Sequence, residues 1–180
     1  MKSKQIEISK FLSYVLRHKP ESIGLELDER GWASVERVVD CAVANGMQMT
    51  CGSIIEIAMD SDKQRFCLSE DRLYIRANQG HSIRVDLGLE ALIPPEKLFH
   101  GTATRFLESI FNEGLQPQRR QHVHLSNDME TAIAVGKRHG VPVVLEIASG
   151  LMHEAEFEFF RSANGVWLTD RVPPEYLKIL

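Results

Sequence analysis

The sequence has few cysteines and no long apolar run. No stretch approaches the roughly 18 apolar residues of a membrane span, and the first ten residues, MKSKQIEISK, do not open into the apolar core of a signal peptide. Cys41, Cys51 and Cys67 are odd in number and form no C-x-x-C pair, which argues against a disulfide framework and a zinc ribbon. We therefore expect a cytoplasmic protein with reduced thiols that serve as small core residues.

Common nucleotide and metal motifs are also missing. None of the twelve glycines forms G-x-G-x-x-G, and Gly136-Lys137 lacks the upstream glycine of a P-loop. No H-E-x-x-H occurs, and His122 and His124 alternate on an expected strand without neighbouring cysteine or carboxylate ligands. The sequence thus argues against Rossmann, P-loop and zinc sites, and we expect no metal.

Neither half of the chain carries a net positive charge. Its net charge is −4, with 12 basic and 14 acidic residues before Pro94 and 9 basic and 11 acidic residues from it onward. Any site for an anion must therefore be a local cluster of cations rather than a broad positive face.

Three amphipathic helices are expected in the N-terminal half. The first shows apolar residues at i, i+3, i+4 and i+7, namely Ile8, Phe11, Leu12 and Val15. Pro20 ends this helix, because a proline disfavours the helical conformation of the residue before it, so Arg17 and His18 fall in the last turn. Ser34 and Thr50 are expected N-caps of the next two helices.

The three helices are followed by an expected β-hairpin. Residues 65–77, RFCLSEDRLYIRA, alternate between apolar and polar around a polar turn at 69–72. Three helices followed by a hairpin predict a winged-helix-like lobe.

Pro94-Pro95 is the expected domain boundary, since two prolines fit neither a helix interior nor a central strand. It divides the chain into lobes of residues 1–93 and 94–180. In the second lobe we expect strands at 97–100, 122–126, 141–148 and 165–169, the last of them at the C-terminal end, and helices at 106–113 and about 128–139. The expected fold class is α+β.

Cationic residues remain as candidates for chemistry. They lie in LRHKP (16–20), DKQRF (62–66), RANQGHS (76–82) and RRQHVHLS (119–126), and FHGT (99–102) and NGVWLT (164–169) accompany them. Each also has a structural interpretation: Arg17 and Arg65 as solvated cations, His18 at the rim of a core, His100, His124 and Trp167 as core residues, Thr102 and Ser126 as helix caps, and Asn164-Gly165 as a turn.

Taken in order and spacing, these motifs resemble the RNA 2′-phosphotransferase family, called KptA in bacteria. The resemblance spans nearly the whole chain and is carried by SKFLSYVLRHKPE, GWASVERVV, KQRF, RANQGHS, LFHGT, VHLS and NGVWLT. It implies an N-terminal winged-helix-like lobe and a C-terminal ADP-ribosyltransferase-like lobe. It also implies removal of an internal 2′-phosphate from RNA, such as a tRNA splice junction, with NAD consumed as co-substrate.

The resemblance further implies roles for individual residues. The catalytic set falls on Arg17, His18, Arg65 and Arg120, and the NAD-binding set on His100, Gly101, Thr102, His124, Ser126 and Val166. Arg120 is chosen over Arg119 because it keeps the R-x-x-V-H-L-S spacing. The implied products are nicotinamide, ADP-ribose 1″,2″-cyclic phosphate and RNA with a free 2′-hydroxyl, formed through an ADP-ribosylated 2′-phosphate.

Two other functions stay open at this point. One is an ADP-ribosyltransferase that modifies another acceptor, such as a terminal phosphate or a protein. This function would leave Arg17 and Arg65 without a role. The other is a non-catalytic winged-helix nucleic-acid binder, disfavoured because the second helix offers only Arg37 as a basic residue. We expect a monomer, and the sequence does not assign roles to Arg76, His81 and Arg119.

Overall fold

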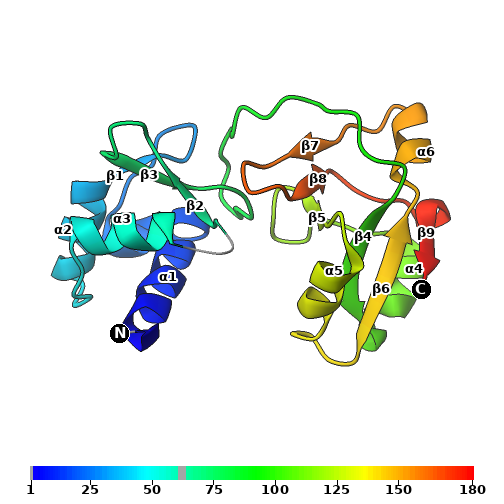
Figure 1. The fold of residues 1–180 in the computed structure, drawn as a ribbon, viewed down its shortest axis with the longest axis horizontal. Coiled ribbons are helices and arrows are strands. Elements are labelled where there is room, and N and C mark those ends of the chain that lie inside the picture. Colours follow the sequence, from blue (N-terminus) through cyan, green and yellow to red (C-terminus); the bar gives the residue numbers. More distant parts are fainter. Residues whose placement is uncertain (1, 61–63) are drawn as a thin grey trace. The chain divides into compact units, whose positions relative to one another are not determined.

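The computed structural model describes residues 2–60 and 64–180. The chain forms two compact units, unit 1 from Met1 to Gly88 and unit 2 from Leu89 to Leu180. Each unit combines helices with small antiparallel sheets (Figure 1), which agrees with the predicted mixture of α and β elements. No helix within the described ranges is both long and apolar enough to cross a membrane.

The first predicted helix is confirmed as α1 (Lys2–Arg17). Ile8, Leu12 and Val15 of the predicted stripe are buried, together with Leu16, while Phe11 is only partly buried against the same core. The amides of His18 and Lys19 both donate to the carbonyl of Tyr14, and Pro20 then begins the short 3-10 helix η1 (Pro20–Ile23). Arg17 and His18 therefore stand at the end of the helix, as the proline predicts.

Both predicted N-caps are confirmed in α2 (Val35–Ala44) and α3 (Cys51–Met59). The Ser34 side chain accepts a hydrogen bond from the amide of Arg37, and the Thr50 side chain accepts one from the amide of Ser53. The Ser53 hydroxyl reaches back to the amide of Thr50, which completes a reciprocal capping box.

The predicted hairpin consists of β2 (Phe66–Leu68) and β3 (Tyr74–Ala77), and β3 also pairs with β1 (Ala33–Ser34) in the order β1-β3-β2. The alternation holds for Ile75 and Ala77, which are fully buried. Leu73 precedes the strand and is 59% exposed, so it is not part of the buried face.

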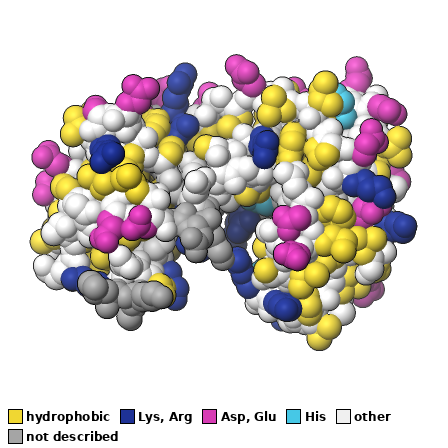
Figure 2. All heavy atoms as spheres, viewed as in Figure 1, with side chains coloured by type: hydrophobic (Ala, Val, Ile, Leu, Met, Phe, Trp, Pro, Cys, Tyr) yellow, Lys and Arg dark blue, Asp and Glu magenta, His cyan; other side chains and the backbone are white. Residues whose placement is uncertain are grey.

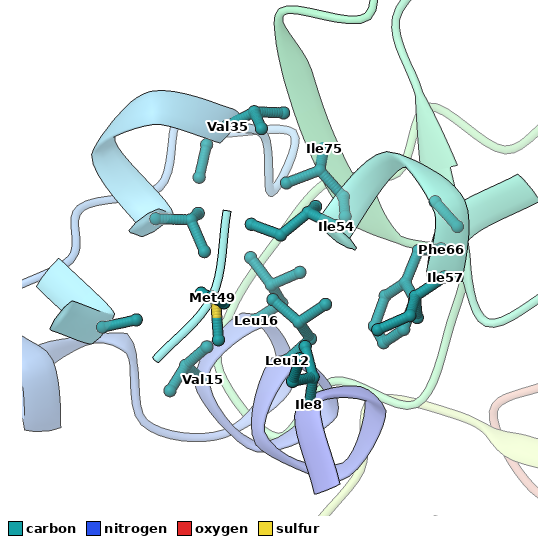
Figure 3. Packing of buried hydrophobic residues seen from close by; sticks show 14 of the residues in the cluster. Ile8, Leu12, Val15, Leu16, Val35, Met49, Ile54, Ile57, Phe66 and Ile75 are labelled. Carbon is teal, nitrogen blue, oxygen red and sulfur yellow. The ribbon is translucent and has the colours of Figure 1, made fainter. Parts of the chain in front are cut away.

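The helices and the hairpin of unit 1 share one core. Figure 3 shows Leu12 and Leu16 of α1 pointing toward Ile54 of α3 and Ile75 of β3, with Phe66 beside Ile57. Burial of a side chain of this size contributes about 1.5–3 kcal/mol. The core therefore fixes where α1 ends relative to the hairpin.

Unit 2 contains two three-stranded antiparallel sheets. One has the order β4-β6-β9 and comprises β4 (Leu98–Ala103), β6 (Pro142–Ile147) and β9 (Leu177–Ile179); the other has the order β5-β8-β7 and comprises β5 (Val123–Leu125), β8 (Trp167–Thr169) and β7 (Phe160–Arg161). The helices are η2 (Thr104–Phe106), α4 (Leu107–Glu113), α5 (Met129–Gly136), α6 (Ser149–Glu154) and η3 (Pro174–Tyr176).

Several predictions for unit 2 need correction. The strand at 165–169 is not the last, because β9 follows it and pairs with β6. The first strand continues through Ala103, and α5 ends at Gly136 rather than near His139. The expected helix at 106–113 begins at Leu107, and only Ile110 of its apolar residues is buried, while Phe106 and Phe111 are exposed.

Helix α5 lies unusually close to strand β4, as Figure 1 shows. Two glycines permit this approach. A Cβ on Gly101 would lie 1.7 Å from the carbonyl oxygen of Ala132, and one on Gly136 would lie 2.6 Å from the carbonyl oxygen of Thr102. Backbone therefore packs on backbone here, and neither position has room for a side chain.

We predict that Gly101→Ala destabilises unit 2 by about 3 kcal/mol or more, because the new methyl group must push α5 off the sheet. Thermal unfolding followed by circular dichroism should show a melting temperature lower by about 12 °C or more. Gly52→Ala is the matched control, since its Cβ would meet only the Thr50 hydroxyl at 3.8 Å. Equal stability of the two variants would contradict this packing.

Candidate active site

Arg17, the last residue of α1, is held by the backbone of two distant segments. Its Nη2 donates a hydrogen bond to the carbonyl of Arg65 at 3.3 Å. Its own carbonyl accepts a hydrogen bond from the amide of Ser82 at 2.9 Å. The end of α1 therefore gathers the segment before β2 and the segment after β3.

The imidazole of His18 is oriented by the same segment. Its Nδ1 lies 3.0 Å from the hydroxyl of Ser82. A hydroxyl can donate or accept a hydrogen bond, so this contact fixes the orientation of the ring in either tautomer. Ser82 thus contacts both residues of the Arg17-His18 pair, one through its amide and one through its side chain.

The segment that carries Arg65 is tied down by Asn78. The amide of Asn78 donates to the carbonyl of Arg65 at 2.9 Å, and its side-chain amide donates to the carbonyl of Gln64. The carbonyl of Arg65 thus accepts hydrogen bonds from both Asn78 and Arg17. Lys63, the first residue of the KQRF motif, lies outside the described residues.

His81 is buried among the cations of unit 1. It is 1% exposed, and no described residue makes a hydrogen bond to its Nε2. Burial and, to a smaller extent, the positive charges of Arg17, His18 and Arg76 together lower the pKa of His81 to about 4. At neutral pH this imidazole is therefore uncharged, and the positive charge near it comes from the residues around it.

In unit 2, His100 of β4 makes a defined hydrogen bond. Its Nδ1 lies 3.0 Å from the carbonyl of His124. Because a carbonyl can only accept, Nδ1 carries the proton. Burial lowers the pKa of His100, partly offset by this hydrogen bond, and Arg120 and His139 lower it further. The neutral ring therefore has an acceptor lone pair at Nε2.

Strands β4 and β5 are brought together by a pair of backbone hydrogen bonds between Phe99 and Ser126, of 2.9 and 2.8 Å. Leu125 of β5 pairs with Trp167 of β8, and extending this register by one residue places Ser126 opposite Val166. The structure thus gathers His100, His124, Ser126 and Val166 at one place in unit 2.

Gly101 and Thr102 have different surroundings on β4. Side chains alternate along a strand, so Thr102 shares a face with His100, and it is 5% exposed. Gly101 faces α5, where its missing side chain permits the close packing described above. Packing alone therefore explains the glycine of the HGT motif.

Arg120 lies in the loop between α4 and β5 of unit 2, where its amide donates to the carbonyl of Pro117 at 3.0 Å. Partial burial and, second, the charge of Arg138 lower the pKa of Arg120, but an arginine remains charged at neutral pH. Its charge also acts on His100. Arg119 is exposed.

The predicted site residues thus form two groups. Arg17, His18 and Arg65 come together in unit 1, and His100, Gly101, Thr102, Arg120, His124, Ser126 and Val166 belong to unit 2. The cap interpretation of two residues is wrong: Thr102 lies within β4, and the N-caps of η2 and α5 are Ala103 and Asp128.

The core and turn interpretations are confirmed for the NGVWLT motif. Trp167 is 6% exposed and donates its indole N–H to Asn127 at 2.8 Å, and Gly165 takes a φ of +81° in the turn. Sequence reasoning missed Ser82 and Asn78. Only their position inside RANQGHS marks them, where Asn78 lies between Arg76 and His81 and Ser82 follows His81.

Acidic and basic side chains are interspersed on the face of the protein in Figure 2. Across residues 2–60 and 64–180, no three His, Cys, Asp or Glu side chains are grouped as ligands of a metal ion would be. The charged and titratable side chains of the candidate site are therefore arginines and histidines.

Comparison with known proteins identifies the family. The family model described as "RNA 2'-phosphotransferase, Tpt1 / KptA family" matches residues 3–171. A protein of Acaryochloris marina named "Probable RNA 2'-phosphotransferase" is 59% identical over 94% of this chain and 93% of its own length. Proteins of the same name from Agrobacterium fabrum (56% identical, 95% and 92% covered) and Pseudomonas fluorescens (51% identical, both chains fully covered) are similar too. The chain therefore belongs to the RNA 2′-phosphotransferase family.

Proposed function

We propose that this protein removes an internal 2′-phosphate from RNA and consumes NAD in doing so. The observation that carries the proposal is the convergence of Arg17, His18 and Arg65 at the end of α1, in a chain of a family that acts on RNA 2′-phosphates. The guanidinium of Arg17 is oriented by the carbonyl of Arg65 and the ring of His18 by the hydroxyl of Ser82, so these residues lie at one place that suits an anionic substrate.

A phosphate monoester suits such a cluster. It carries about −1.5 to −2 charges at neutral pH, so it is a nucleophile without a general base and needs only to be neutralised and oriented. A guanidinium presents a planar fork of donors that matches two phosphate oxygens. His18 adds an imidazole, a group that can donate a proton to an oxygen. We propose that Arg17, His18 and Arg65 bind the 2′-phosphate and that Arg120 is the fourth catalytic residue.

The residues gathered around His100 fit NAD. The acceptor at Nε2 of His100 suits a ribose hydroxyl, and Thr102 on the same face adds a second hydroxyl partner. Gly101, His124, Ser126 and Val166 complete the proposed NAD-binding set. We propose that unit 2 binds and orients NAD, since orientation of a reactive cosubstrate is a large part of catalysis.

The reaction then takes two steps. In the first, an oxygen of the RNA 2′-phosphate attacks C1″ of the nicotinamide ribose, and nicotinamide leaves. In the second, the ribose 2″-hydroxyl gives up its proton to solvent and attacks the phosphorus, the bond to the RNA 2′-oxygen breaks, and ADP-ribose 1″,2″-cyclic phosphate is released. His18 supplies the proton that the departing 2′-oxygen takes up, and the arginines stabilise the charge at phosphorus.

The architecture of each unit supports this division of roles. Unit 1 has three helices followed by a hairpin, the order of a winged-helix-like lobe, and we propose that it is one. We propose that unit 2, with two small antiparallel sheets and a histidine on a central position of β4, is an ADP-ribosyltransferase-like lobe.

The direct test is to incubate the protein with NAD and a short RNA that bears one internal 2′-phosphate. We expect equal amounts of nicotinamide, 2′-hydroxyl RNA and ADP-ribose 1″,2″-cyclic phosphate, measured by mass spectrometry.

Excess EDTA should leave the rate unchanged, because arginines take the charge-neutralising role that a metal has in many phosphoryl transfers.

Two results would overturn the proposal. Inorganic phosphate instead of the cyclic product would indicate a phosphatase. Stable ADP-ribosylation of a terminal phosphate or of a protein, without removal of the 2′-phosphate, would indicate the alternative transferase. Loss of activity in EDTA with recovery in magnesium would refute only the metal-free mechanism.

The proposed phosphate site predicts the effect of three substitutions. Arg17→Ala, Arg65→Ala and Arg120→Ala should each lower kcat about 100-fold or more, the scale of losing one charge-stabilising donor. Arg119→Ala, the matched neighbour of Arg120, should have a much smaller effect. Circular dichroism separates this loss from unfolding. A folded Arg65→Ala variant with near wild-type kcat would remove Arg65 from the site.

A further inference from the structure

A second arginine of unit 1, Arg76 of β3, is held against an aromatic ring. Its guanidinium carbon lies 4.7 Å from the centre of the Trp32 ring. Its Nη1 donates to the carbonyl of Arg30 and its Nε to the thiol of Cys67, both at 3.4 Å. A ligand that binds this guanidinium therefore does not have to order a mobile side chain, which is a major cost of binding for arginine.

The Arg76–Trp32 pair adjoins the residues around Arg17 and His18. Arg76, Arg17 and His18 all contribute to the lowered pKa of the buried His81. Gly31, the residue before Trp32, packs over His81: a Cβ on Gly31 would lie 3.6 Å from His81 Nε2. Ser82, the residue after His81, contacts Arg17 and His18, so the neighbours of Trp32 and of the end of α1 meet at His81.

The chemistry of the pair suits a nucleotide. RNA bases stack on aromatic rings and on guanidinium planes, and arginine also binds the phosphodiester. Trp32 and Arg76 are both half-buried and keep part of their surface open. A net charge of −4 leaves no broad positive face to bind RNA, so contacts next to the phosphate site have to supply the affinity.

We propose that Trp32 and Arg76 form a platform for the RNA nucleotide adjacent to the one that carries the 2′-phosphate. The proposal rests on the proposed function, because it assumes that the 2′-phosphate binds near Arg17 and His18. It assigns to the pair the binding of the RNA chain and no part in the chemical steps.

The test compares two substrates that differ only in the neighbouring nucleotides. One is a single nucleotide with a 2′-phosphate, and the other is the same nucleotide inside a single-stranded oligoribonucleotide. With saturating NAD, Arg76→Gln should raise KM for the oligonucleotide about 10-fold, the scale of one lost stacking contact, and leave kcat and both constants for the single nucleotide within two-fold. Arg76→Lys keeps the positive charge but lacks the planar guanidinium. It should raise KM for the oligonucleotide by a smaller factor than Arg76→Gln.

Arg72→Gln is the matched control, because Arg72 is an exposed arginine of the same hairpin, and it should behave as wild type on both substrates. An equal rise in KM on both substrates would place Arg76 in the phosphate site instead. No change on either substrate, with folding verified by circular dichroism, would make the Arg76–Trp32 pair purely structural. If Arg76→Gln does not fold, the Arg76→Lys and Trp32→Phe variants decide by the same comparison.

A binding measurement separates failure of the platform from failure of the proposed function. A plain oligoribonucleotide without a 2′-phosphate is titrated into the protein while tryptophan fluorescence is recorded. Quenching in the wild type that disappears in Trp32→Phe supports the platform even if no reaction with NAD occurs. Quenching that persists in Trp32→Phe comes from Trp167 and overturns it.

Discussion

The hydrogen bonds around the last turn of α1 determine the position of every candidate residue in unit 1. The guanidinium of Arg17 reaches the carbonyl of Arg65, and Ser82 contacts both the carbonyl of Arg17 and the ring of His18. The core beneath them, with Leu16 of α1 against Ile54 and Ile75, keeps the helix end and the hairpin in register. A change in that packing would move the cations as a group.

The partners that hold these cations decide what the site can bind. The carbonyl of Arg65 orients the guanidinium of Arg17, and the hydroxyl of Ser82 orients the ring of His18. The buried His81 stays neutral beside them, because burial and the neighbouring positive charges lower its pKa to about 4. Arg17, His18 and Arg65 thus form a local group of basic residues in a chain that is negative overall, and such a group suits a compact dianion such as a phosphate monoester.

The sequence predicted those parts of the fold that depend on local rules. The stripe of α1, the caps Ser34 and Thr50 and the hairpin at 66–77 follow from periodicity and turn chemistry. The short strands β1, β7 and β9 were missed, because two or three residues are too few to show a period and their pairing partners lie far away in the sequence.

Only those residues of the candidate site that stand in a recognisable motif could be predicted from the sequence. The arginines and histidines stand in recognisable stretches, but the residues that hold them do not. Ser82 and Asn78 act through backbone and side-chain hydrogen bonds made on folding, and the stacking of Arg76 on Trp32 joins residues 44 positions apart. Gly101 shows the converse: the motif marked it as a cofactor residue, and the structure gives it a packing role as well.

The central claim of this account is that the phosphate leaves RNA by transfer to the ribose of NAD and not to water. An NAD analogue that lacks the 2″-hydroxyl of the nicotinamide ribose tests it most directly, because the first step needs only C1″ and the second needs that hydroxyl. With this analogue, adenylate label should move onto the RNA and remain there, with one nicotinamide released for each RNA and no dephosphorylated product. The appearance of free 2′-hydroxyl RNA would require water as the nucleophile and would contradict the account.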